Sequence, residues 1–138
     1  MYLFPSTREA LCDILPPYAD CQLGPVAAWA DKIKGRVRWA NSLHYVNGVG
    51  DHPSNKCVFG EEGWQGQPGI NLLGGIRNTT DWMLDGKDGA EEALKFFVHF
   101  MGDMHMPLHL TGRNKGGNNG MSLYLFVIFA VTHFWVVL

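Results

Sequence analysis

The sequence carries little charge of either sign and no excess of positive charge. Its 138 residues include 11 lysines and arginines against 13 acidic residues, which gives a formal net charge of −2. A protein that attracts a polyanion through its overall field needs a clear basic excess, so local groups would have to hold any such partner here. The length suits one compact domain and leaves little room for a second.

Cysteine is also scarce. Cys12, Cys21 and Cys57 are an odd number, so at least one of them lacks a partner within the chain. The sequence contains no Cys-x-x-Cys pair of the kind that forms zinc knuckles. The count leaves both the pairing and the redox compartment open.

The N-terminus lacks the features of a secretory signal. It has no basic start followed by a long apolar run, so we expect nothing in these residues to export the chain. Asn78-Thr79-Thr80 nevertheless matches the N-glycosylation acceptor pattern, which matters only in a secreted protein and also occurs by chance. We therefore treat Asn78 as a candidate glycosylation site.

Apolar spacing predicts helices and an all-α fold. Ser6 is the expected cap of a helix that ends before Pro16-Pro17, and Pro25 suits the first turn of the next helix. The expected helices cover residues 6–15, 24–35, 71–84 and 90–106. Residues 41–69 are rich in glycine and proline and predict a long loop around an extended segment at 43–46.

The last eighteen residues differ from all that precede them. "MSLYLFVIFAVTHFWVVL" has no charged side chain apart from a possible proton on His133. We therefore divide the chain into a domain at 1–120 and an apolar tail at 121–138. The tail is at the lower limit of length for a membrane span, and a buried strand pair or an unplaced tail is the alternative.

Three histidines and an aspartate crowd the stretch "HFMGDMHMPLH", residues 99–109. His99 and Asp103 are four residues apart on the predicted helix, so both project from one face. They border an apolar arc that we expect to be buried, made of Ala93, Leu94, Phe97, Phe100, Met101 and Met104. Pro107 ends or kinks the helix, which lets His109 turn back toward the same region.

Such a cluster has two interpretations. Histidine nitrogens and carboxylate oxygens are the ligands of hydrolytic zinc sites, and a carboxylate can bridge two metal ions where an imidazole cannot. A single histidine beside an apolar helix face is more often a hydrogen-bonded structural residue. From the residues alone, metal ligation and a structural role are equally open for the cluster.

Four motifs together resemble a known family. "ALKFFVHFMGDMHMPLH" followed by "GGNN", with "VAAWAD" and "LHYVN" upstream, resembles the zinc-dependent single-strand nucleases and 3′-nucleotidases of fungi and plants. The likeness covers most of residues 6–119 in the family's order. It implies a mostly helical fold like that of zinc-dependent phospholipase C, with three zinc ions in a cleft. It also implies a secreted, glycosylated, disulfide-linked enzyme that cleaves single-stranded DNA and RNA to 5′-mononucleotides and removes 3′-phosphates from nucleotides.

The resemblance also assigns roles to individual residues. Asp31, His44 and His99 would bind the first zinc, and Asp103, which we take as catalytic, would bridge it to a second. His109 would be one ligand of a third, more exposed zinc. By its position on the helix, His105 points away from the face of His99 and Asp103, so we expect it to support a ligand or to be structural. His52 and His133 match no motif.

Two further assignments concern the substrate. Lys34 stands where many members have an arginine and would contact the scissile phosphate, although with a point charge in place of a bidentate fork. Asn47 stands where members often have a base-recognising aspartate. The plain alternatives are a surface charge for Lys34, a turn former beside Gly48 for Asn47 and a solvated helix position for Asp31.

The chain also departs from the family pattern. The family's N-terminal tryptophan and histidine are absent, and no histidine and aspartate pair follows Gly116-Gly117-Asn118. We therefore expect about one complete zinc site and interpret the sequence as a truncated product. Three functions stay open: a zinc-dependent phosphodiesterase, a non-catalytic remnant with one structural zinc or none, and a fragment tethered to a membrane through 121–138.

Overall fold

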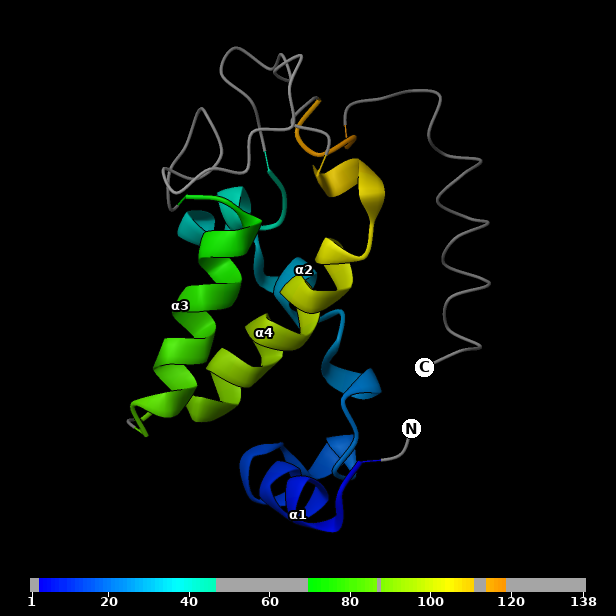
Figure 1. Ribbon diagram of the computed structural model, residues 1–138, viewed down its shortest axis with the longest axis vertical. Helices are drawn as coiled ribbons and strands as arrows, with labels where there is room; N and C mark the ends of the chain where they lie inside the picture. The colour runs from blue at the N-terminus through cyan, green and yellow to red at the C-terminus, as the bar shows by residue number, and fades with distance from the viewer. Residues whose placement is uncertain (1–2, 47–69, 87, 111–113, 119–138) are drawn as a thin grey trace.

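The computed structural model describes residues 3–46, 70–86, 88–110 and 114–118. In these ranges the chain forms helices and turns without a β-strand, which confirms the all-α prediction. The order is α1 (Pro5–Ile14), η1 (Pro17–Ala19), η2 (Gly24–Val26), α2 (Trp29–Ile33), η3 (Arg38–Leu43), α3 (Leu72–Leu84), α4 (Ala90–Met104) and η5 (Pro107–Leu110), where η marks 3₁₀-helices (Figure 1).

Helix α1 begins one residue before the expected cap. Pro5 occupies the first turn, Phe4 is the N-cap residue, and no side chain caps the helix. The expected role of Ser6 as the cap was therefore wrong. Proline supplies the helix start instead, because its fixed φ is already helical and its missing N–H is one that the first turn leaves unpaired.

The continuous helix expected over residues 24–35 is broken into η2 and α2. Val26 packs in a cluster with α1, whereas Ala30 packs in a second cluster against α4. The interruption between them, with Ala28 at φ −92° and ψ 6°, lets the chain pass from one cluster to the other. Tertiary packing therefore overrides the helical spacing at this point.

The expectation of an extended segment at 43–46 was wrong for its first half, residues 43 and 44. Leu43 ends η3, and His44 follows it with helical dihedral angles of −80° and −12°. Ala40 and Leu43 are both buried, and a spacing of three residues brings them to one face because a 3₁₀-helix has three residues per turn. The remainder of the expected loop, 47–69, lies outside the described residues.

Helices α3 and α4 pack side by side as the central pair of the structure (Figure 1). Asn71 caps the N-terminus of helix α3, since its side-chain oxygen accepts a hydrogen bond from the Gly74 N–H at 3.0 Å. Gly75 provides the close approach, since a Cβ at this position would lie 3.1 Å from Cε2 of Phe100 on α4.

The buried face of α4 differs from the expected arc. Ala93, Phe96 and Phe100 are fully buried, whereas Met104 is 40% exposed. Phe97 and Met101 are half-buried. The expected arc was therefore correct at Ala93, Leu94 and Phe100 but missed Phe96, because α2 and η3 both pack on the side of α4 where Phe96 lies.

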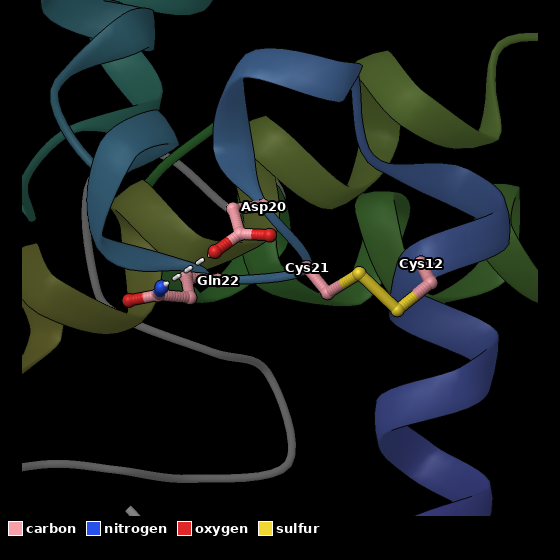
Figure 2. The surroundings of a disulfide bond; sticks show 4 residues. All are labelled: Cys12, Asp20, Cys21 and Gln22. Carbon is pink, nitrogen blue, oxygen red and sulfur yellow. Dashed lines mark hydrogen bonds between the residues drawn. A yellow bond between two sulfur atoms is a disulfide. The ribbon is translucent and has the colours of Figure 1, made fainter.

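Among the described residues, the core consists of two clusters that share α4. The larger one contains Phe96 and Phe100 with residues of α2, η3 and α3, and the smaller one contains Leu94 with residues of α1, η1 and η2. A disulfide between Cys12 on α1 and Cys21 fastens the smaller cluster (Figure 2). The structure thus selects one of the pairings that the three cysteines allowed.

No helix in the described ranges is long and apolar enough to span a bilayer. Residues 119–138 lie outside the described residues, so the expected boundary at 120 and the apolar tail at 121–138 stay predictions.

Candidate metal site

Five candidate ligands come from four separate elements. Asp31 lies on α2, His44 directly follows η3, His99 and Asp103 lie one turn apart on α4, and His109 lies on η5. A hydrogen bond from the Val46 N–H to the His109 carbonyl, 2.7 Å long, ties the segment after η3 to η5. Packing on α4 thereby gathers side chains that are up to 78 positions apart in the sequence.

Four of these side chains bring ligand atoms together around the nitrogens of His44 and His99. Nδ1 of His44 lies 3.0 Å from Nε2 of His99. Oδ2 of Asp103 lies 3.1 Å from the same His44 nitrogen and 3.2 Å from the His99 nitrogen. Oδ1 of Asp31 completes the group, at 3.9 Å from His44 and 3.7 Å from His99.

The spacings of Asp31 and Asp103 from the two histidine nitrogens, and of these nitrogens from each other, are close to those between ligands of a tetrahedral metal ion. With metal–ligand bonds of about 2.0–2.2 Å, the ligand atoms of a tetrahedral zinc site lie about 3.3–3.6 Å apart. The five distances above range from 3.0 to 3.9 Å and therefore bracket that value. Asp31, His44 and His99 alone already form a group that could hold a metal ion.

Asp103 faces in two directions. Its Oδ2 belongs to the group with His44 and His99, whereas its Oδ1 lies 3.7 Å from Nε2 of His109. The Asp103 side chain is 14% exposed and that of His109 is 20% exposed. A carboxylate held in this way has one oxygen for each of two neighbouring sites.

Backbone carbonyls fix the orientation of two of the histidines. The Nδ1–H of His99 donates to the Ala27 carbonyl at 2.7 Å, which leaves the lone pair on Nε2 facing the group. His109 repeats this arrangement, because its Nδ1–H donates to the Gly116 carbonyl at 2.7 Å. A hydrogen bond of this kind selects the tautomer that can bind a metal.

The charges of the site perturb two pKa values. Burial opposes protonation of His99, but the hydrogen bond and charge of Asp103, with the Ala27 carbonyl and Asp31, outweigh it and raise its pKa above 6.5. Burial also opposes ionisation of Asp103, yet hydrogen bonds from His44 and His99 and the positive charge of nearby histidines lower its pKa below 3.8. The site therefore stabilises a negative carboxylate beside a positive group, which favours a cation there.

The other predicted residues fall in different places. Nζ of Lys34 lies 3.3 Å from Oδ1 of Asp31, and its side chain is 59% exposed beside the site. His105 is exposed, and its Nδ1–H donates to the Met101 carbonyl. Asn78 is exposed on α3. Asn47, His52 and His133 lie outside the described residues.

The sequence did not reveal the roles of Ala27 and Gly116. Each contributes only a backbone carbonyl, and a carbonyl leaves no signal in the identity of its residue. Gly116 stands in the "GGNN" motif and has φ +64°, a conformation that glycine adopts readily. This φ value explains why a glycine suits the position that holds His109.

The sequence matches the S1/P1 nuclease family over residues 1–125. It is 35% identical to Endonuclease 2 of Arabidopsis thaliana over 122 residues, which cover 82% of this chain and 42% of that protein. It is 33% identical to Nuclease P1 of Penicillium citrinum, over 85% of this chain and 44% of the relative. With Nuclease S1 of Aspergillus oryzae the identity is 33%, over 82% of this chain and 40% of the relative.

The chain spans about two fifths of the length of these curated relatives. The family match includes α2, the segment after η3 and α4, which carry Asp31, His44, His99 and Asp103. On this evidence the chain belongs to the S1/P1 nuclease family.

Proposed function

We propose that this chain forms the metal-binding part of a zinc-dependent phosphodiesterase that cleaves single-stranded DNA and RNA to 5′-nucleotides and removes 3′-phosphates from nucleotides. One observation carries the proposal: Asp31, His44 and His99 form a group that could hold a metal ion, and Oδ2 of Asp103 lies 3.1 and 3.2 Å from the two histidine nitrogens of that group. When bound there, zinc supplies a Lewis acid for the phosphate and an activated water for the attack on phosphorus.

The residues of the chain have separate roles in this proposal. His44 and His99 would hold the metal through side chains that are each 9% exposed, and Asp31 would hold it from the solvent side, where its side chain is 52% exposed. Asp103 joins this site to the one that His109 faces. Because burial excludes water from the histidine side, the substrate must approach from the side of Asp31.

Lys34 is the proposed phosphate contact. Its ammonium group lies beside Asp31 and is exposed, so it can approach a phosphate bound at the open side of the site. We keep Asn47 as a proposed base contact from sequence alone.

Location outside the cytosol is part of the same proposal. The Cys12–Cys21 disulfide is typical of proteins in oxidising compartments, and exposed Asn78 is accessible to glycosylation. Mass spectrometry of protein from a eukaryotic secretory host would detect a glycan on Asn78.

The first experiment measures hydrolysis of a labelled single-stranded oligonucleotide by the purified chain with zinc. We expect turnover by the wild type, loss of turnover with chelator, and loss of at least about a hundredfold in Asp103→Ala, since this residue joins two sites. Asp81→Ala, which removes an exposed carboxylate from α3, is the matched control and keeps wild-type turnover. A folded chain without turnover contradicts the enzyme proposal.

A second candidate is a non-catalytic domain stabilised by one zinc. It is favoured by the ligand count, because Asp31, His44 and His99 are the one group in the described part of the chain that could hold a metal ion, and His109 faces Asp103 without completing a second such group there. Metal analysis is expected to find about one tightly held zinc per chain. A stoichiometry of three contradicts this expectation, and one zinc without hydrolysis supports the second candidate.

A further inference from the structure

Positive charge is concentrated between two of the candidate ligands. Residues 32–39, which we call the basic segment, lie between Asp31 and His44 and contain four of the chain's 11 lysines and arginines and no acidic residue. These are Lys32, Lys34, Arg36 and Arg38, and all four are exposed. In a chain with a net charge of −2, this is a local basic surface, not a consequence of overall composition.

Apolar packing and backbone hydrogen bonds fix the position of the basic segment. Ile33 and Val37 pack against the larger core cluster. The N–H groups of Arg36 and Val37 both donate to the Ile33 carbonyl, at 2.7 and 3.0 Å. The segment continues into α2 at one end and η3 at the other, so its position relative to the metal site is set by the same packing that positions Asp31 and His44.

Three of the four cations have no acidic partner among the residues that the structure describes. Lys34 pairs with Asp31, but Lys32, Arg36 and Arg38 form no ion pair with any residue in the described ranges. Like charges this close in sequence repel one another, and an anion bound along the segment would relieve that repulsion. Four exposed cations within eight residues can contact more than one phosphate of a polynucleotide.

Trp39 adds an aromatic surface at the end of the segment. Its side chain is 59% exposed, yet one part of the indole packs against Phe96 at a centroid distance of 5.4 Å. A tryptophan that is held on one side and open on the other provides a platform on which a base can stack. Stacking of this kind beside a basic groove is the usual way in which proteins bind single strands.

We infer that the basic segment binds the sugar–phosphate backbone of a single-stranded polynucleotide beyond the cleaved bond, with a base stacked on Trp39. This inference rests on the proposed function, which brings the strand to Asp31 and His44. The combination of cations with an exposed indole selects a single strand over a duplex, because base faces are covered in a duplex. It selects a nucleic acid over an anionic membrane because the segment offers one isolated aromatic ring and no apolar face.

The test measures binding without chemistry. Fluorescence anisotropy of labelled oligothymidylates of about four and about sixteen nucleotides is recorded in chelator, over a series of salt concentrations. In Arg36→Gln/Arg38→Gln we expect binding of the longer strand to weaken at least about fivefold at low salt. The slope of log K against log salt should fall by about 1.4, since each phosphate contact to a single strand contributes about 0.7.

The matched control is Arg8→Gln/Arg77→Gln, which removes two exposed arginines from α1 and α3. It keeps the affinity and the slope of the wild type, and Arg36→Lys/Arg38→Lys keeps most of the affinity because the charge is retained. Trp39→Leu also weakens binding of the longer strand, but it leaves the slope of log K against log salt unchanged. The inference is overturned if both glutamine pairs lose equal affinity for the strand. It is also overturned if the changes at Arg36 and Arg38 affect only binding to anionic phosphatidylserine vesicles. Because metal is chelated, this result is independent of whether the chain hydrolyses its substrate.

Discussion

His99 shows how one residue can serve both the fold and the site. Its Nδ1–H donates a hydrogen bond to the Ala27 carbonyl. Its Nε2 faces the carboxylates of Asp31 and Asp103 and the ring of His44. Without a metal, a proton on Nε2 is stabilised by Asp103, which is why the pKa of His99 is raised. Metal and proton therefore compete for the same nitrogen.

The first prediction is that zinc and chelator give opposite pH dependences of stability. The raised pKa of His99 stabilises the metal-free chain below pH 6.5, and this contribution is lost as the pH rises through the raised value. The lowered pKa of Asp103 contributes to stability above pH 3.8, and this contribution is lost as the pH falls through the lowered value. Zinc affinity instead falls as His99 becomes protonated.

Denaturant unfolding across about pH 5 to 8, in chelator and in excess zinc, checks this prediction. The chelated protein should be most stable on the acidic side of that range and the zinc-loaded protein on the neutral side. His105→Ala, which changes an exposed histidine, keeps both profiles. Parallel profiles with and without zinc would mean that His99 is not a ligand.

At the scale of elements, the contact between α3 and α4 supports the site through Phe100. This ring packs edge-on against His44 at a centroid distance of 5.4 Å, on the same helix that carries His99 and Asp103. Gly75 of α3 lets the two helices approach each other at Phe100. A change in helix spacing would therefore displace His44.

The second prediction concerns this spacing. In Gly75→Ala the new Cβ would lie 3.1 Å from Cβ of Leu43 and from Cε2 of Phe100, so these neighbours must move. We expect the free energy of unfolding to fall by about 1–3 kcal/mol, more than the gain in helix propensity offsets, with a decrease in zinc affinity. Thermal denaturation and a zinc competition titration measure the two effects.

Gly102→Ala is the control for this change, because a Cβ there meets nothing within 4 Å. Up to about 1 kcal/mol of added stability is expected from helix propensity alone. If both alanine variants behaved alike, the close approach at Gly75 would have no role in stability.

In the part of the chain that the structure describes, the core forms two clusters on one helix. The site adjoins the larger cluster, whose Phe100 packs against His44, whereas the disulfide adjoins the smaller one, at the end of the structure where α1 lies (Figures 1 and 2). Asp31 and His44 directly follow Ala30 and Leu43 of the larger cluster. Stability and metal binding should therefore be separable.

The third prediction uses the disulfide to test this separation. Cys12 and Cys21 are nine positions apart, and closing a loop of that size contributes about 2–3 kcal/mol by restricting the unfolded chain. Cys12→Ser/Cys21→Ser should lose about that much stability and keep its zinc stoichiometry. Denaturant unfolding measures the stability and metal analysis measures the zinc content, with reduced wild type as the reference. Loss of zinc together with stability would show that the two clusters are coupled.

The sequence by itself determined the helical class and the residues capable of binding a metal. The positions of α3 and α4 follow from apolar spacing, and the four-residue interval between His99 and Asp103 places them on one face of a helix. These are local properties, because hydrogen bonds within a few residues set the period of a helix. The motifs that resemble the nuclease family are likewise short and contiguous.

Only the tertiary structure decided how the site is assembled. The break between η2 and α2, the helical conformation at His44 and the burial of Phe96 all depend on contacts with α4 that no local pattern contains. The same holds for the approach of Asp31 and His44 to His99 and for the carbonyls that orient the imidazoles. Distances between residues so far apart in the chain are set by packing, which a single sequence does not specify locally.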